Sequence, residues 1–217
     1  MVKTYQNYDR LEFLENSTTY TKDIHTTIVR GLDAQFDKQL FDIYRLVCGF
    51  SYVENMNNST TSAKHSYNVA SGYLENRLDL FDNKLNVDLS ARLDDYSNFG
   101  TQINPSLDLL YKFNDAIKLH GLISRSYRAP TFNDLYWPDE GWAKGNINLK
   151  PEKGITGELG VESRINKYLS ASLTYYRSDY KQLIQWSDNG SGVWQPMNVS
   201  SAVINGLEFE NKIFNLL

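Results

Sequence analysis

Alternation of apolar and polar side chains with a period of two is the feature that most restricts how this chain folds. Between Lys84 and Asp94 every second residue is apolar, and the residues between are polar or charged. The apolar set is Leu85, Val87, Leu89, Ala91 and Leu93, and the polar set is Asn86, Asp88, Ser90, Arg92 and Asp94. Successive side chains of a β-strand point to opposite faces, so this segment predicts a two-faced strand and has no helical interpretation.

The same period recurs along the chain. It is repeated at 103–113, 117–126, 169–175 and 207–213, and in noisier form at 28–36 and 44–52. Several segments run beyond about ten residues, which is enough for a tilted strand to cross a membrane. We count about ten sequential strands with no domain boundary or low-complexity linker. The pattern predicts an all-β fold, an antiparallel up-and-down β-barrel or a section of one.

The connections between these strands alternate in length. Short Asp- and Asn-centred turns are expected at 37–38, 82–83, 114–115 and 166–167. Longer polar connections are expected at 15–23, 54–64, 96–101, 128–154 and 187–198. In an up-and-down sheet this alternation puts the short turns at one end and the long loops at the other. Outer-membrane barrels have this asymmetry, so it favours a transmembrane β-barrel.

Composition excludes some classes of protein and leaves two open. A net charge of −4 and a pI near 5.4 argue against a nucleic-acid partner, which requires a basic surface. The single cysteine, Cys48, excludes an internal disulfide and a cysteine-based metal site. No segment reaches the roughly 18 apolar residues of a membrane helix, and the first residues lack the apolar region of a signal peptide. A mean hydropathy of −0.49 suits a soluble β-protein and equally a membrane barrel with a wet lumen.

One interruption of the alternating pattern, from Gly121 to Glu152, carries a recognisable motif. The strand-like segment GLISRSYR ends at Ala129-Pro130, a loop rich in Trp and Gly follows, and NLKPE leads back into regular structure. Each proline biases the residue before it to extended geometry and removes a backbone N–H. The loop therefore has a fixed boundary at both ends.

This interruption resembles the signature of TonB-dependent outer-membrane receptors, in which a strand ends in Y-[RK]-A-P and N-L-x-P-E opens the next strand. Further matches, GELGVES and INGLEFE, follow in the family's order, and the resemblance covers roughly Lys84 to Lys212. The residues that match the family motifs, with structural roles implied, are Tyr127, Arg128, Ala129, Pro130, Asn148, Leu149, Pro151, Glu152, Gly206 and Glu208. Within the family, the short loop and its flanks are most similar to receptors for cobalamin and for catecholate siderophores.

The resemblance implies a bacterial outer-membrane barrel of about 22 strands with a plugged lumen. It also implies a plug domain that contacts TonB, and uptake of cobalamin or a ferric siderophore driven by the inner-membrane proton gradient. No plug precedes Met1, and the chain stops at Leu217 in or just after a strand. We therefore expect residues 1–217 to be a partial receptor barrel without the plug domain and the C-terminal strands. Unpaired strand edges are costly in lipid, so either further strands are supplied or the piece closes as a smaller barrel.

Catalysis finds little support in the sequence. His25, His65 and His120 are far apart, and no G-x-S-x-G, H-E-x-x-H or phosphate-binding glycine loop occurs. Asp94-Asp95 and Asp139-Glu140 offer oxygen ligands that suit Ca²⁺. The simpler interpretation is that charged residues lie where strands meet water. We expect no enzyme activity, no resident metal and no cofactor.

Aromatic residues in the long loops are the candidates for ligand binding. They are Tyr136, Trp137 and Trp142 in one loop and Trp194 in the next. Flat rings with few rotamers make large contact surfaces for a corrin, a catecholate or another large ligand. The alternative is that the rings belong to an interface belt or pack one loop on another, which is the favoured interpretation for Trp186. Arg128 is expected to pair with Glu152 or Glu158.

Two other functions stay open at the level of sequence. A polar lumen face also suits a passive outer-membrane pore formed by a small barrel, which works without TonB. A soluble β-protein that binds lipid or carbohydrate is the second alternative. Heat-modifiable migration on a gel after detergent extraction separates the membrane barrel from the soluble sheet.

Overall fold

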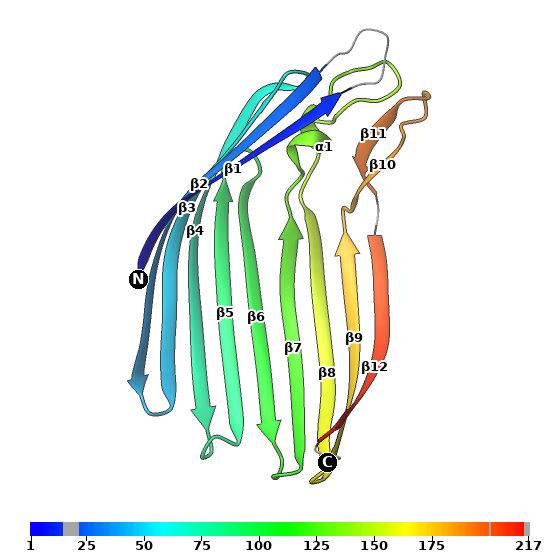
Figure 1. Ribbon diagram of the computed structural model, residues 1–217. Helices are drawn as coiled ribbons and strands as arrows, with labels where there is room; N and C mark the ends of the chain where they lie inside the picture. Colours follow the sequence, from blue (N-terminus) through cyan, green and yellow to red (C-terminus); the bar gives the residue numbers. More distant parts are fainter. Residues whose placement is uncertain (15–21, 200, 215–217) are drawn as a thin grey trace.

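The computed structural model describes residues 1–14, 22–199 and 201–214. Ten strands form one antiparallel sheet in the order β1-β2-β3-β4-β5-β6-β7-β8-β9-β12, and β10 and β11 form a separate hairpin (Figure 1). The elements are β1 (Val2–Leu14), β2 (Lys22–Phe41), β3 (Tyr44–Ser59), β4 (Ala63–Leu80), β5 (Leu85–Tyr96), β6 (Gly100–Lys112), β7 (Ile117–Arg128), α1 (Phe132–Tyr136), β8 (Glu152–Asn166), β9 (Leu169–Lys181), β10 (Ile184–Asp188), β11 (Trp194–Asn198) and β12 (Ser201–Ile213). The predicted strand number and up-and-down order are confirmed.

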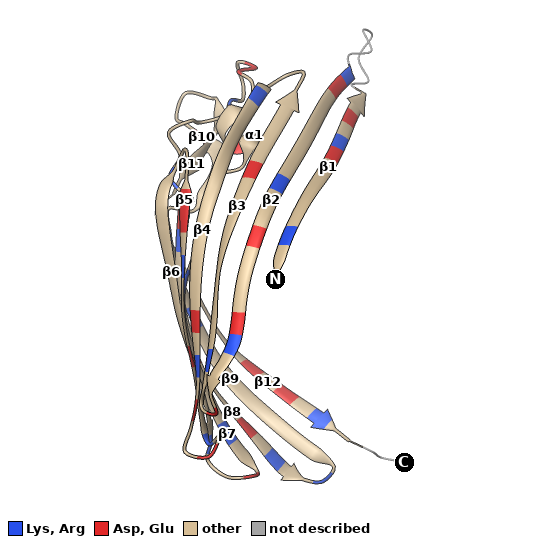
Figure 2. Cartoon of the chain, turned by 90° about the vertical axis from the view of Figure 1, so that its left-hand side faces the viewer, with Lys and Arg blue, Asp and Glu red and all other residues tan. Residues whose placement is uncertain are grey.

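The sheet is curved (Figure 2). Its two faces carry different residues, as the alternation predicts. The polar residues Asn86 and Asp88 of β5 line a hollow together with His120 of β7, which marks their side as the inner face. The apolar residues lie on the outer face, where Leu89 is 51% exposed and Leu159 of β8 is 69% exposed. Exposed apolar side chains along so many strands fit contact with lipid.

Buried apolar side chains are few in the part of the chain that the structure describes. Val47 and Val69 are buried in the sheet, and Leu135, Ala143 and Leu149 are buried in the loop between β7 and β8. A barrel wall has lipid on one side and a lumen on the other, so it requires no dry layer between packed sheets. Most of the buried apolar side chains therefore lie in the β7–β8 loop and not in the sheet.

One end of the sheet, here called the turn end, carries short turns as predicted. Asp82 and Asn83 have positive φ between β4 and β5, which Asp and Asn tolerate better than most residues. The turn expected at 37–38 is wrong, because both residues belong to β2 and the chain turns at 42–43. Asp37 is held in the strand by the guanidinium of Arg45 on β3, which donates hydrogen bonds of 2.7 and 2.5 Å to its carboxylate.

The opposite end, here called the loop end, carries α1 and the β10–β11 hairpin (Figure 1). Two connections expected to be long, 54–64 and 96–101, are tight turns at 60–62 and 97–99. The prediction was wrong because β3 and β4 pair continuously to the tip of their hairpin. Polar residues there are strand residues, since a hairpin that extends beyond lipid can be polar on both faces.

The long connection expected at 128–154 is confirmed, since residues 129–151 join β7 to β8 and contain α1. The connection expected at 187–198 is right only in part, because β9 already ends at Lys181, and residues 184–188 and 194–198 pair as strands β10 and β11. The connection expected at 15–23 lies mostly outside the described residues. Within the part described, no helix combines the length and the apolar character needed to cross a membrane.

The ladder between β6 and β7 ends before the loop end. Pairing runs from Lys112 and Lys118 to Ser106 and Ser124, and it stops next to Pro105. Proline has no N–H to donate, so it is a poor residue for continuing a ladder. Beyond this point the hydroxyl of Tyr127 on β7 donates a hydrogen bond to the hydroxyl of Tyr96 on β5. This hydrogen bond links β7 to β5 across β6 at the loop end of the sheet.

We predict that Leu89→Arg destabilises the barrel wall and that Ser90→Arg on the neighbouring inner position does not. Arg near the middle of a lipid-facing strand costs about 2–4 kcal/mol of folding free energy, whereas an inner-face Arg meets water and Glu75 of β4. Urea unfolding of the protein from its native gene in lipid vesicles measures both changes. Equal destabilisation by the two substitutions would contradict the assignment of the faces.

Candidate functional site

The β7–β8 loop, residues 129–151, starts with a well-fixed turn. Pro130 is fully buried. Thr131 is the N-cap of α1, and its hydroxyl oxygen accepts a hydrogen bond of 3.1 Å from the N–H of Asp134. The Asp134 carboxylate accepts in return from the Thr131 N–H at 3.0 Å. This capping box gives the N–H groups of Thr131 and Asp134 a hydrogen-bond acceptor each. It thereby stabilises a helix of only five residues.

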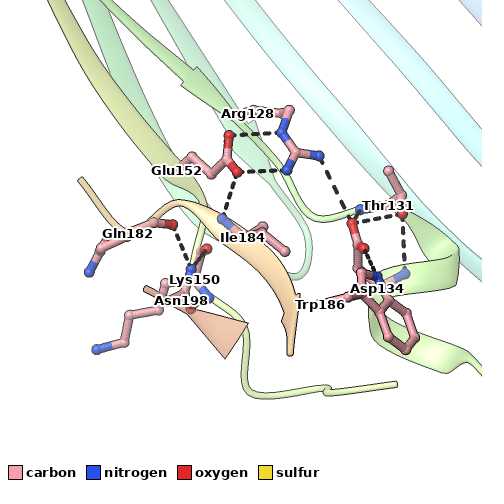
Figure 3. Close-up of polar contacts among 9 residues, drawn as sticks. All are labelled: Arg128, Thr131, Asp134, Lys150, Glu152, Gln182, Ile184, Trp186 and Asn198. Atoms are coloured by element: carbon pink, nitrogen blue, oxygen red, sulfur yellow. Dashed lines mark hydrogen bonds and ion pairs between the residues drawn. The ribbon is translucent and has the colours of Figure 1, made fainter. Parts of the chain in front are cut away.

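Arg128 at the end of β7 and Glu152 at the start of β8 form a bidentate ion pair where the loop joins the sheet (Figure 3). The guanidinium donates hydrogen bonds of 2.8 and 2.6 Å to the carboxylate, which also accepts one of 2.6 Å from the N–H of Ile184 in β10. The hydrogen bonds from Arg128 lower the pKa of Glu152, so the pair stays charged at neutral pH. The expected pairing of Arg128 is thus with Glu152, because Glu158 faces His120 at 3.3 Å.

Asp134 joins the loop to the β10–β11 hairpin (Figure 3). The residue is 8% exposed. Its Oδ1 accepts a hydrogen bond of 3.1 Å from the indole N–H of Trp186 in β10. Its Oδ2 accepts hydrogen bonds from both the N–H and the hydroxyl of Thr131, and it lies 4.0 Å from the Arg128 guanidinium. A buried carboxylate with so many partners fixes the elements that supply them.

Asn198 at the end of β11 makes the second connection (Figure 3). Its Oδ1 accepts a hydrogen bond of 2.8 Å from the Lys150 N–H. Its Nδ2 donates hydrogen bonds of 2.8 Å to the carbonyls of Lys150 and Gln182. The side chain replaces a strand partner for backbone groups that would otherwise lack one.

Backbone hydrogen bonds also connect the β7–β8 loop to the β10–β11 hairpin. The Trp194 N–H donates a hydrogen bond of 2.7 Å to the Trp142 carbonyl, and the Lys144 N–H donates one of 3.0 Å to the Trp194 carbonyl. A Cβ on Gly145 would lie 2.6 Å from backbone atoms of Leu135 and Trp137, so only glycine fits there without a shift. Residues 129–151 and 184–198 thus form one assembly, which we call the loop–hairpin unit.

The structure separates the four aromatic candidates into two groups. Tyr136 stacks on the ring of His65 of β4, with 3.5 Å between ring centroids, and Trp137 lines the cleft described below. Trp142 and Trp194 are adjacent through their backbones, are 61% and 50% exposed, and do not line that cleft. Ligand contact by these four residues stays a prediction.

The sequence predicted some of the contacts between the loop and the hairpin and did not reveal others. The packing interpretation of Trp186 is confirmed, because its ring lies edge-to-face with that of Trp137 at 6.1 Å. Asp134 was missed, although T-F-N-D before a short apolar segment is a readable capping pattern. Asn198 carried no local signal, since its partner Lys150 is 48 residues away in the chain.

The matched motif residues lie where the two ends of the loop join the sheet and in β12. Leu149, Pro151 and Pro130 are buried, Ala129 is half-buried, and the Asn148 N–H donates a hydrogen bond to Asn146. Gly206 of β12 leaves room for the ring of Tyr176, which would lie 2.3 Å from a Cβ. Glu208 lies opposite Thr174 of β9. The structural roles that the resemblance implies for these residues stay a prediction.

A cleft of about 480 Å³ lies between the β7–β8 loop and the inner face of β1, β2 and β3. Cross-strand pairs place its strand residues on one face: Phe13 opposes Asp23, Leu11 opposes His25, and Asp9 opposes Thr27. The loop contributes Thr131, Phe132, Asn133, Trp137, Pro138 and Glu140. Across the residues with described positions, no group of His, Cys, Asp or Glu is arranged to hold a metal ion.

Comparison with known proteins decides the family. The family model described as TonB dependent receptor-like, beta-barrel matches residues 2–216. The chain belongs to this family. The resemblance inferred from the RAP and NLKPE motifs is confirmed, and the TonB-dependent receptor family is one of bacterial outer-membrane barrels.

Relatives of this chain within the TonB-dependent receptor family include proteins named as vitamin B12 transporters and as siderophore receptors. The vitamin B12 transporter BtuB of Photobacterium profundum is 41% identical over 123 residues, 55% of this chain and 20% of that protein. A probable TonB-dependent siderophore receptor, PirA of Acinetobacter baumannii, is 33% identical over 140 residues, 56% of this chain and 18% of that protein. The chain thus spans about a fifth of the length of the curated relatives it matches.

A solved receptor of the family has the same fold. The crystal structure of the siderophore receptor PirA from Pseudomonas aeruginosa superposes with a TM-score of 0.78 at 22% identity. The match covers 96% of this chain and 44% of that one. The ten-stranded sheet therefore corresponds to part of a TonB-dependent receptor barrel, as the sequence predicted.

We predict that Asp134→Asn loosens the loop–hairpin unit. An amide has one acceptor oxygen in place of two, so the Trp186 and Thr131 hydrogen bonds cannot both be kept, at a cost of about 1.5–3 kcal/mol. Hydrogen exchange should rise at least about tenfold in 131–136 and 184–188.

Asp139→Asn is the matched control in the same loop. Asp139 is exposed and accepts a hydrogen bond of 3.0 Å from the Gly141 N–H, which an asparagine oxygen can accept equally well. Unchanged exchange in Asp134→Asn, or the same change in both variants, would contradict the role given to Asp134.

Proposed function

We propose that this chain is the barrel section of an outer-membrane receptor for TonB-dependent uptake of cobalamin or a ferric siderophore. The observation that carries the proposal is the loop–hairpin unit, a loop and a hairpin joined by polar side-chain contacts at one end of a lipid-facing sheet. A passive wall needs no such joint, whereas a ligand site gains affinity from a preorganised surface. Relatives named as a vitamin B12 transporter and as siderophore receptors support it.

The sheet requires further strands to work in a membrane. Among the described residues its edges are β1 and β12, which each pair on one side. Every unpaired backbone group in lipid costs several kcal/mol, so a stable wall needs these edges paired. We propose that the remaining strands of a larger barrel pair with β1 and β12, and that a plug domain which contacts TonB fills the lumen.

The inner face suits a polar plug. Ion pairs line it, with 3.2 Å between Arg77 and Asp88 and 2.8 Å between Arg92 and Asp94. A plug with a polar surface can exchange hydrogen bonds with such a wall and be moved against it when TonB pulls. A ligand held at the loop end then passes through the barrel, and no covalent chemistry takes place. We therefore propose a transport protein and not an enzyme.

The polar inner face also favours a second candidate, a passive pore. The two functions differ in energy dependence, because a pore conducts along a concentration gradient and a receptor requires TonB.

We predict that cells carrying the native gene accumulate cobalamin or a ferric siderophore only when TonB is present. Uptake of radiolabelled cyanocobalamin and of ⁵⁵Fe-siderophores, measured with and without tonB, tests this. Accumulation that continues without TonB would favour the pore. A protein that is soluble without detergent would exclude both membrane functions and favour the soluble lipid or carbohydrate binder.

A further inference from the structure

The cleft between the β7–β8 loop and the inner face of β1–β3 has large apolar side chains in its lining. Leu11 and Phe13 of β1 are 49% and 52% exposed, and Trp137 of the loop is 37% exposed. Exposed apolar side chains of this size are costly in water. A partly apolar cleft of about 480 Å³ is of the size that seats a small molecule or one face of a larger one.

The Asp and Glu side chains that line this cleft carry one sign of charge. Asp9, Asp23 and Glu140 line it, and among the described lining residues there is no Lys or Arg. His25 is the remaining titratable lining group, and its ring lies edge-to-face with Phe13 at 5.7 Å. The sequence of 15–21, ENSTTYT, also contains no basic residue.

Arg10 and Lys22 are the basic residues next in sequence to Asp9 and Asp23. Both form ion pairs on the outer face of the β1–β2 hairpin. Lys22 and Arg10 both contact the Glu12 carboxylate, at 2.6 and 2.7 Å. In the loop, Lys144 lies 4.0 Å from Asp139. The field inside the cleft is therefore negative, and a cleft with a low-dielectric wall focuses such a field on whatever enters.

We propose that this cleft receives an uncharged or cationic ligand with broad apolar and amide surface, of the corrinoid type, and disfavours anionic ferric catecholates. This inference rests on the proposed uptake function and narrows its ligand. Apolar rings contact the flat ligand, Asn57 and Asn133 of the lining offer amide partners, and the carboxylates repel ligands of negative charge.

The test compares three probes that differ in charge. They are cyanocobalamin, its monocarboxylate derivative in which one side-chain amide is hydrolysed, and ferric enterobactin. Equilibrium binding is measured on outer membranes that contain the protein from its native gene, at low and high salt. We expect cyanocobalamin to bind tightest, the monocarboxylate about fivefold more weakly at low salt, and ferric enterobactin at least about tenfold more weakly.

The Asp9→Asn, Asp23→Asn double variant removes two charges and keeps the shape of the side chains. It should bring cyanocobalamin and its monocarboxylate to within about twofold of each other. Asp115→Asn, which removes an exposed carboxylate at the turn end, is the control and should leave the ratio unchanged.

Tight binding of ferric enterobactin, or a monocarboxylate ratio that the double variant does not change, would overturn this inference and leave the uptake function standing. Binding of none of the three probes by protein that is inserted in the membrane would overturn both.

Discussion

The pairing of backbone N–H and C=O groups along the sheet is the constraint on which this structure depends. In lipid there is no water to form hydrogen bonds with an unpaired backbone group. Every strand between β1 and β12 therefore needs a neighbouring strand on both sides. The continuous ladders leave side chains free to differ on the two faces, apolar outside and polar inside. At the loop end, beyond the point beside Pro105 where the β6–β7 ladder stops, a hydrogen bond between Tyr127 and Tyr96 links β7 to β5.

The same requirement explains the loop–hairpin unit. The β7–β8 loop and the β10–β11 hairpin lie outside the ten-stranded sheet, so backbone groups that no ladder pairs need side-chain partners. Asp134 accepts from the Thr131 N–H, and Asn198 forms hydrogen bonds with the backbone of Lys150 and Gln182. Arg128 and Glu152 then connect the loop–hairpin unit to the ends of β7 and β8. Rigidity at the loop end thus comes from a few polar side chains, of which Asp134 is buried.

The period of two was enough to predict the fold class, the strand order and the two faces, because alternation is a local property of each strand. The alternation did not predict strands where both faces of a strand are polar, as in 54–64. A hairpin that extends beyond the membrane has no apolar face, so its sequence does not alternate. The RAP and NLKPE motifs identified the loop ends. The partner of Asn198 could not be predicted, because only the folded chain brings it near Lys150. The cleft was missed for the same reason: β1 meets the loop only in space.

Spin-label accessibility along β5 tests most directly whether this sheet is a membrane wall. Labels are placed one at a time from Leu85 to Asp94 in the protein from its native gene, reconstituted in lipid vesicles. Collisions with oxygen, which concentrates in lipid, should peak at the odd-numbered positions, and collisions with a water-soluble nickel chelate should peak at the even-numbered ones. A uniform profile, or a period near 3.6 residues, would contradict the account.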